Sequence, residues 1–258
     1  MCHGRGVQRT ELHFHLLPGV DDGPADLAGS VELARLAVAD GTGLVTATPH
    51  VRSLLAHDRL GELPARVAEV VGALRAAAVP LAVRTGAELA HEDLPALADA
   101  DLEAIAQGPP GRRWVLIEAP LFGDDPAGFL AATGELRARG FGTLIGHPER
   151  CAALMEAPGA IEAELAAGAR LQVNGSSLTG YHGPLTQARG IALVREEQVA
   201  AIASDAHRPG RGPVLSAALA ALAAVGIRAA EALVAERPRA LLAEGIPALP
   251  RPARAAAA

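Results

Sequence analysis

Histidines and carboxylates recur at or shortly after the ends of nearly all short apolar runs of the sequence. The residues in this pattern are His13, His15, Asp22, His50, Glu88, Glu118, His147, Asp205 and His207. His13 and His15 lie two apart in an expected strand, so both side chains point to one face of it. If the apolar runs are parallel strands, their carboxyl ends meet at one edge, where sites are built in α/β barrels. The spacing therefore predicts that these side chains converge.

The chemistry of such a cluster is that of a metal site. Neutral imidazole and carboxylate groups suit Mn, Fe or Zn. Two or three divalent ions held close together activate water and stabilise both oxygens of a phosphoester displacement. Without cations, converging carboxylates would repel and raise each other's pKa. Singly, each residue has an ordinary explanation: a His-x-His pair on a surface strand, a carboxylate in a salt bridge, or Asp21 and Asp22 as turn residues.

The elements that must position these residues alternate along the chain. Strands are expected at Glu11–His15, Leu44–Thr48, Leu81–Ala87, Trp114–Glu118, Thr143–Gly146, Leu171–Asn174 and Val199–Ser204. Helices are expected at Leu27–Ala39, Leu60–Ala77, Pro126–Arg139, Ala160–Ala167, Thr186–Glu197, Val214–Ala224, Ala229–Arg237 and Pro238–Ala243. This alternation predicts an α/β fold with parallel strands. We expect one barrel domain over residues 1–250 and a disordered tail over 251–258.

Composition excludes several other classes of protein. The formal net charge of -6 disfavours a nucleic-acid partner, which requires a basic surface. Two cysteines, Cys2 and Cys151, are too few for a disulfide framework and fit a reducing compartment. Neither begins a Cys-x5-Arg motif, so a thiol nucleophile is not expected. No apolar run is long enough to span a membrane and no apolar leader begins the chain, so we expect a cytoplasmic protein.

The segment His13–Pro24, HFHLLPGVDDGP, resembles the opening motif of the bacterial tyrosine-protein phosphatases of capsular polysaccharide operons. That branch belongs to the PHP (polymerase and histidinol phosphatase) superfamily. Further matching segments are Ala47–His50, Gly86–Glu88, Leu116–Glu118, Gly146–Arg150, Gln172–Asn174 and Ser204–His207. The opening motif and His-Pro-Glu-Arg are specific to the branch, whereas the spacing of His and Asp marks only the superfamily.

The resemblance implies a distorted seven-stranded (β/α) TIM-like barrel with three metals, Mn being favoured. His13, His15, Glu88 and Asp205 would bind the first ion. Glu88, Glu118 and His147 would bind the second, and Asp22, His50 and His207 the third. Arg150 matches an arginine that holds the phosphate. The second such arginine falls near Arg211, but the spacing from Asp205 is one residue short, which leaves Arg208 as an alternative. Glu11 stands where the family has Asp, outside the expected ligands.

Three functions are compatible with this pattern. The first is a protein-tyrosine phosphatase that uses metal-bound hydroxide, acting on a phosphotyrosine-bearing protein such as a membrane-associated tyrosine kinase of polysaccharide synthesis or export. The second keeps the site but takes a small phosphomonoester such as histidinol phosphate. The third is a non-catalytic, metal-stabilised binding module, against which the complete ligand set counts. The sequence leaves the oligomeric state open. His3, His57, His91 and His182 are expected to be ordinary surface residues.

Overall fold

The structure of the chain, a computed structural model, describes residues 8–123 and 126–249. Cys2, His3 and the tail 251–258 lie outside these residues. The strands are β1 (Arg9–Phe14), β2 (Thr42–Ala47), β3 (Ala82–Thr85), β4 (Glu88–Ala90), β5 (Trp114–Glu118), β6 (Gly142–Gly146), β7 (Arg170–Asn174) and β8 (Val199–Ala203). All neighbouring strands pair in parallel. The expected α/β class is therefore confirmed.

Helices connect the strands, as the alternating pattern predicts. The α-helices are α1 (Leu27–Ala39), α2 (Val51–Leu55), α3 (Leu63–Ala76), α4 (Asp99–Ile105), α5 (Ala127–Ala138), α6 (Ala152–Glu156), α7 (Ala160–Ala166), α8 (Gly175–Leu178), α9 (Pro184–Arg195), α10 (Leu215–Ala224) and α11 (Glu236–Glu244). Short 3-10 helices are η1 (Leu60–Glu62), η2 (His91–Ala96), η3 (Pro148–Arg150) and η4 (Glu231–Leu233). No helix in the described ranges is long and apolar enough to cross a membrane.

The expectation of seven strands in one barrel is wrong in detail. The described strands form two sheets, with the orders β1-β2-β3 and β4-β5-β6-β7-β8. The expected third strand, Leu81–Ala87, is where they divide: β3 pairs with β2, and Glu88 opens a new strand that pairs with β5. Gly86 lies at the break, where an added Cβ would come within 2.6 Å of Thr46 Cγ2. The chain can change sheets here because this position carries no side chain.

Two short contacts join the sheets, and we call them the seams. At the first seam, isolated bridges connect Phe14 to Ala206, and the backbone N–H of His15 donates to the carbonyl of Ala206. At the second, His50 bridges to Glu88, whose N–H donates to the carbonyl of Pro49. Both seams lie just beyond the carboxyl ends of strands, where the candidate site residues are.

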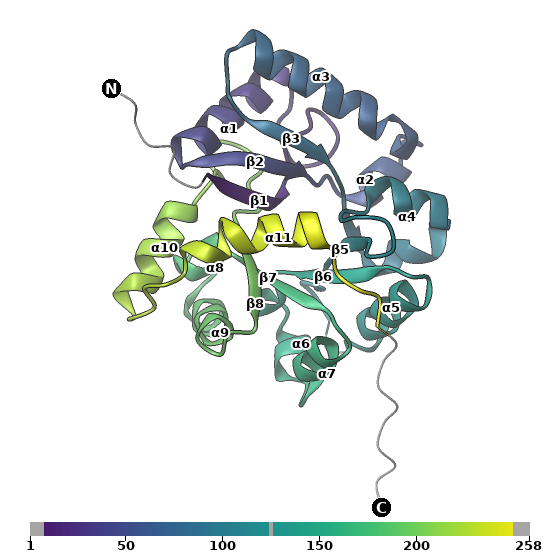
Figure 1. Cartoon of the computed structure of the whole chain (residues 1–258), viewed down its shortest axis with the longest axis vertical. Coiled ribbons are helices and arrows are strands. Elements are labelled where there is room, and N and C mark those ends of the chain that lie inside the picture. The colour runs from purple at the N-terminus through teal and green to yellow at the C-terminus, as the bar shows by residue number, and fades with distance from the viewer. Residues whose placement is uncertain (1–7, 124–125, 250–258) are drawn as a thin grey trace, which may run out of the picture.

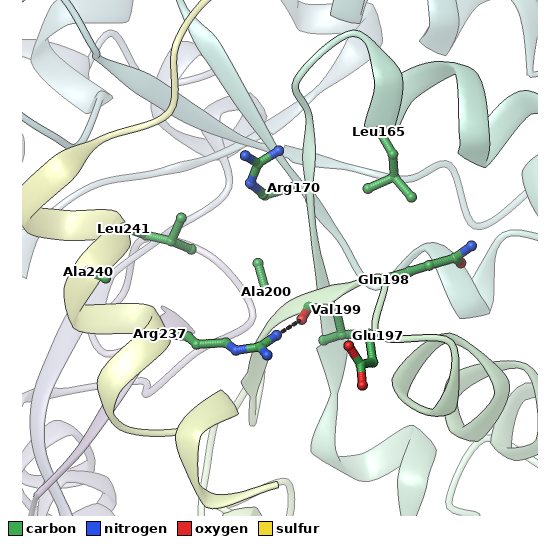
Figure 2. A pocket seen from close by; sticks show the side chains of 9 residues that line it. All are labelled: Leu165, Arg170, Glu197, Gln198, Val199, Ala200, Arg237, Ala240 and Leu241. Atoms are coloured by element: carbon green, nitrogen blue, oxygen red, sulfur yellow. Dashed lines mark hydrogen bonds between the residues drawn. The ribbon is translucent and has the colours of Figure 1, made fainter.

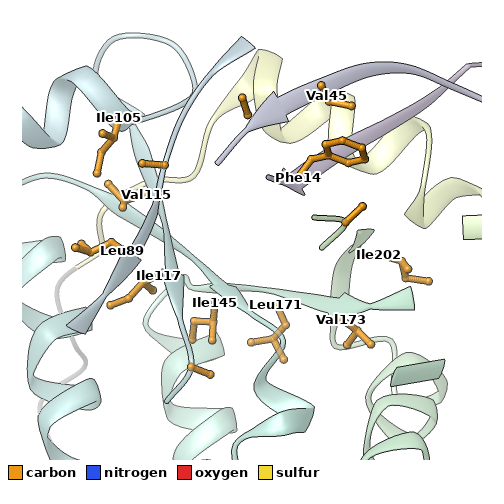
Figure 3. Close-up of a cluster of buried hydrophobic side chains, with 14 of the residues drawn as sticks. Phe14, Val45, Leu89, Ile105, Val115, Ile117, Ile145, Leu171, Val173 and Ile202 are labelled. Atoms are coloured by element: carbon orange, nitrogen blue, oxygen red, sulfur yellow. The ribbon is translucent and has the colours of Figure 1, made fainter. Parts of the chain in front are cut away.

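Apolar side chains cover both faces of the strands. Figure 3 shows Val115, Ile145 and Val173 of the second sheet directed toward the surrounding helices. A second, smaller cluster fills the space on the other face. It consists of Leu12, Trp114, Leu116, Leu144, Ala201 and Ile246. Burial of strands on both faces is what parallel sheets require, and here the inner cluster forms the floor beneath the strand ends.

Helix α11 covers the amino ends of the strands. Figure 1 shows it crossing in front, with β1–β3 above it and β7–β8 below. The indole N–H of Trp114 donates to the carbonyl of Leu241, and Arg237 donates to the carbonyl of Val199. Both partners begin a strand. One end of the protein is thus closed by packing, which leaves the carboxyl end free for a site.

A buried ion pair fastens two of the covering helices to each other. Arg137 of α5 lies 2.7 Å from Glu164 of α7, and both side chains are almost fully buried. Removing one partner would leave an unpaired charge in the interior, whereas an apolar pair of similar volume needs no compensation.

We therefore expect Arg137→Met to lower the free energy of unfolding by about 3–5 kcal/mol. The double variant Arg137→Met, Glu164→Leu should recover most of that loss, because neither charge remains. Urea unfolding of the two variants and the wild type measures the difference. A single variant as stable as the wild type would show that the ion pair does not hold these helices.

Candidate metal centre

The nine residues predicted from the sequence all come together in the structure. They approach in four overlapping groups whose ligand atoms lie within 4.8 Å of one another: His13, His15 and Glu88; His13, His147 and Asp205; His50, Glu88 and Glu118; and His15, Asp22, His50 and His207. The grouping differs from the expected one, since His15 also joins the Asp22 group and His50 joins Glu118. Eight of the side chains belong to the carboxyl ends of strands or to the loops that follow them, and Glu88 opens β4 directly after the break at Gly86.

Glu88 is the centre of this cluster. Its Oε1 lies 3.1 Å from Nε2 of His13 and 3.2 Å from Nε2 of His147. Its Oε2 lies 3.2 Å from Nε2 of His15 and 3.0 Å from Nδ1 of His50. The carboxylate is buried. A buried carboxylate touched by four imidazoles has the position of a bridging ligand between cations.

Glu118 and Asp22 mark two further sides of the cluster. The Oε1 of Glu118 lies 3.8 Å from Nε2 of His147, and burial with the charge of Glu88 raises the pKa of Glu118 to about 7. The Oδ1 of Asp22 lies 3.1 Å from Nε2 of His207, and its side chain is 56% exposed. The cluster is therefore open to solvent on the side of Asp22. On the buried side, the carboxylates of Glu88 and Glu118 lie close together, and a bound cation would compensate their charges.

A hydrogen-bond relay fixes the orientation of His13. Asn174 Nδ2 donates to the carboxylate of Asp205, and Gln172 Nε2 donates to Asn174 Oδ1. The remaining oxygen of Gln172, Oε1, lies 3.0 Å from Nδ1 of His13. Because an ionised carboxylate only accepts, each amide in the relay is oriented and Nδ1 of His13 must be the donor. In the neutral ring, Nε2 then carries a lone pair directed into the cluster, as a metal ligand does.

Asp21 fixes the orientation of His15, a role that the sequence analysis did not predict. Its Oδ2 lies 2.8 Å from Nδ1 of His15 and accepts the backbone N–H of His50. Its Oδ1 accepts the N–H of Gly23, which is the expected turn bond. With Nδ1 of both histidines directed to acceptors, the Nε2 atoms of His13 and His15 face each other at 3.3 Å. Two lone pairs converging in this way fit a divalent cation.

Two of the cluster residues have strained backbones. His147 has φ 38° and Asp205 has φ 52°, both in the left-handed region. That region is unfavourable for residues other than glycine, and such strain persists only where surrounding structure imposes it. Each residue directly follows or nearly follows a strand, so the left-handed turn directs its side chain back over the strand ends.

Two arginines border the cluster. Arg211 Nη2 lies 2.6 Å from Oδ2 of Asp205, and Arg150 Nη1 lies 3.4 Å from the same oxygen. Arg211 also approaches Asp22, at 3.5 Å. Arg208 is exposed, and its backbone pairs with that of Arg211 in the turn after β8. The fold thus directs Arg150 and Arg211 toward the cluster, and of the two alternatives it favours Arg211.

His182 is closer to the site than its treatment as a surface residue assumed. It is half-buried, and its Nε2 lies 3.0 Å from Oγ of Ser176 in α8, directly after β7. Burial, with the positive charges of Arg150 and Arg211, lowers the pKa of His182 to about 4. Its distance along the sequence from both arginines hid this proximity. His57 is exposed, as expected.

Glu11 stays outside the cluster, as the resemblance implied. Its Oε2 accepts the backbone N–H of Ser204 at 2.7 Å, and burial raises its pKa to about 8. Its position ties β1 to the end of β8, one residue before Asp205.

A larger hollow lies at the opposite end of the strands. Figure 2 shows it between α11 and the start of β8, with a volume of about 470 Å³. Arg170, Glu197 and Arg237 lie among its apolar lining residues, and the hydrogen bond from Arg237 to Val199 crosses it. None of the nine cluster residues lines it. Size alone therefore does not locate the chemistry of this protein.

The fold and the cluster define an α/β protein with a candidate metal centre at the carboxyl ends of parallel strands. Residues 9–243 match the model of the family described as capsular polysaccharide synthesis, CpsB/CapC. The chain belongs to this family.

Similar proteins support the same family assignment. The tyrosine-protein phosphatase YwqE of Bacillus subtilis is 32% identical over 76% of this chain and 76% of its own. A putative tyrosine-protein phosphatase, CapC of Staphylococcus aureus, is 26% identical over 77% and 76%. A crystal structure reported for YwqE and for CpsB from Streptococcus pneumoniae, metal-dependent tyrosine phosphatases, matches with a TM-score of 0.77 and 26% identity, covering 95% of this chain and all of that one.

The geometry leads to a prediction about metal content. We expect His13→Ala with His15→Ala to lower the bound metal measured by elemental analysis and to lower the Tm, because a bound ion stabilises the folded state by mass action. His57→Ala, at an exposed histidine outside the cluster, is the matched control. Full metal occupancy in the double variant would contradict the ligand assignment.

Proposed function

We propose that this protein is a metal-dependent protein-tyrosine phosphatase that acts in the cytoplasm. The observation that carries the proposal is the nine-residue cluster bordered by two arginines. The substrate class is supported by the relative YwqE, a tyrosine-protein phosphatase, and by the matched crystal structure of metal-dependent tyrosine phosphatases. Within this proposal, the phosphotyrosine belongs to a protein partner such as a membrane-associated tyrosine kinase of polysaccharide synthesis or export.

Two or three divalent ions, Mn favoured over Fe or Zn, would be held by the nine cluster residues. As the family resemblance implies, His13, His15, Glu88 and Asp205 would form one set, Glu88, Glu118 and His147 a second, and Asp22, His50 and His207 the third. When bound, such ions activate water and stabilise the departing oxygen by Lewis acidity. The water attacks phosphorus, the bond to the tyrosyl oxygen breaks, and tyrosine and inorganic phosphate are released.

The contribution of the protein chain is to position groups around that reaction. Arg150 and Arg211 are anchored on Asp205, and their remaining N–H groups can hold phosphate oxygens that face away from the metals. Gln172 and Asp21 keep His13 and His15 in the orientation for ligation. The phenol of the leaving tyrosine has a pKa of about 10, so its phenolate departs more readily than the alkoxide of an aliphatic alcohol.

Thiol chemistry has no place in this proposal. Cys151 is 1% exposed, and its sulfur accepts the backbone N–H of Leu154 at the start of α6. Burial raises the pKa of the thiol, which disfavours the thiolate that a nucleophile requires.

The test of the proposal is turnover. We expect a phosphotyrosyl peptide to be hydrolysed with a higher kcat/KM than histidinol phosphate, with metal content measured on the same sample. The reverse preference would identify a small-molecule phosphatase. A metal-loaded protein inactive on both would leave the non-catalytic binding module as the better description.

The arginines give a second, sharper prediction. Arg150→Lys should keep its metals and lose roughly ten- to a thousand-fold in kcat/KM, because an ammonium cannot replace a bidentate guanidinium and each charge-assisted bond contributes about 1.5–3 kcal/mol. Arg211→Ala should behave similarly. Arg208→Ala, whose side chain is exposed, is the control and should match the wild type. A large loss in Arg208→Ala alone would mean that the wrong arginine was chosen.

A further inference from the structure

The protein uses aromatic side chains sparingly, and one of them is almost fully exposed. The sequence contains four Phe, one Trp and one Tyr. Phe14, Phe129, Phe141 and Trp114 are buried. Tyr181 is 68% exposed, and Phe122, in the loop after β5, is 91% exposed. One exposed apolar residue is ordinary on a protein surface, so its location must decide whether it has a role.

Phe122 lies at the end of a groove that begins in the candidate metal centre. A hollow of about 210 Å³ is lined by His50, Glu88 and Glu118 of the cluster and by Arg52. A second hollow, of about 200 Å³, is lined by Pro120, Leu121 and Phe122. The two hollows share Arg52, Ala90 and Glu118. The two hollows are therefore neighbours, and we take the path across their shared residues, from the cluster to the aromatic ring, as the groove.

The path is short enough for a single substrate residue. Phe122 follows Glu118 by four residues, so their Cα atoms are at most about 15 Å apart, even if the segment were fully extended. A phosphate held at the cluster would place the group attached to it along this path. Pro120 and Leu121 give that part of the groove an apolar wall.

Among the described residues that line the groove, the carboxylates Glu92, Asp93 and Glu118 outnumber the one arginine, Arg52. Arg52 lies 3.3 Å from Asp93 and 3.5 Å from Glu92. His91 lies 3.2 Å from the same oxygen of Glu92. These charged groups contact one another, and the part of the groove beyond them is lined by Pro120, Leu121 and Phe122. That apolar wall suits a phenyl ring.

We propose that Phe122 determines specificity by packing against the phenyl ring of the substrate's phosphotyrosine. The inference rests on the proposed phosphatase function and names the residue that selects aryl over alkyl phosphates. Aromatic rings in contact prefer offset or edge-to-face packing, which an exposed ring at a groove mouth can adopt. Phe122 touches substrate in this arrangement without taking part in bond cleavage.

Binding of two non-hydrolysable probes tests the proposal without depending on turnover. Phenylphosphonate and methylphosphonate share the phosphonate and differ in the ring. We expect calorimetry on the metal-loaded protein to show tighter binding of phenylphosphonate, and Phe122→Ala to reduce that preference roughly ten-fold. Phe122→Tyr should retain it. Val225→Ala, at the exposed end of α10, is the matched control and should also retain it.

Turnover separates the remaining interpretations. In Phe122→Ala, kcat/KM should fall by about the same factor for free phosphotyrosine and for a phosphotyrosyl peptide, with little change for glycerol phosphate. A loss confined to the peptide would overturn the proposal, since Phe122 would then contact flanking residues. An unchanged phenyl-to-methyl preference would overturn it while leaving the phosphatase function intact. A wild type inactive on every phosphoester would overturn that function and this inference together.

Discussion

The placement of one buried carboxylate constrains the rest of the structure. Glu88 contacts four imidazoles from the ends of β1, β2 and β6. Burial acts to raise its pKa, but His13 and the other imidazoles hold the pKa of Glu88 well below its ordinary value. A charge in such a position is tolerated only where its partners are held in place. The strand lengths, the break at Gly86 and the relay through Gln172 all serve that placement.

Local irregularities of the backbone direct side chains of the candidate metal cluster toward one another. The pairing of β1 with β2 shifts register between Glu11 and Phe14, so β1 contains one residue more than its partner over this stretch. That bulge lets Leu12 pack in the inner apolar cluster while His13, its neighbour, lies in the candidate metal cluster. Bulges re-aim side chains in this way next to functional sites. The left-handed turns at His147 and Asp205 have the same effect at other strand ends.

The convergence of the nine cluster residues could be predicted better than the groups that support them. Most of the nine lie at the end of an apolar run, and parallel strands bring such positions together; Asp22, in the loop Pro18–Pro24, is assigned with the help of the family resemblance. The division into eight strands could not be predicted, because the segment Leu81–Ala87 has the pattern of one strand. The close approach of Thr46 to Gly86, which leaves no room for a Cβ atom, exists only in the folded protein. Asp21 and His182 were missed for a related reason. The turn bond to Gly23 explains Asp21 without reference to His15, and nothing local links His182 to the arginines.

The seams have a consequence for how this architecture can change over evolutionary time. Residues of the cluster, or their immediate neighbours, make the backbone bonds that join the two sheets, at Pro49–Glu88 and His15–Ala206. An insertion in these loops would displace a cluster residue and separate the two sheets at the same time. At the amino ends of the strands, which α11 covers, a change of loop length would not move the cluster residues. We therefore expect insertions to be tolerated better at that end than at the seams.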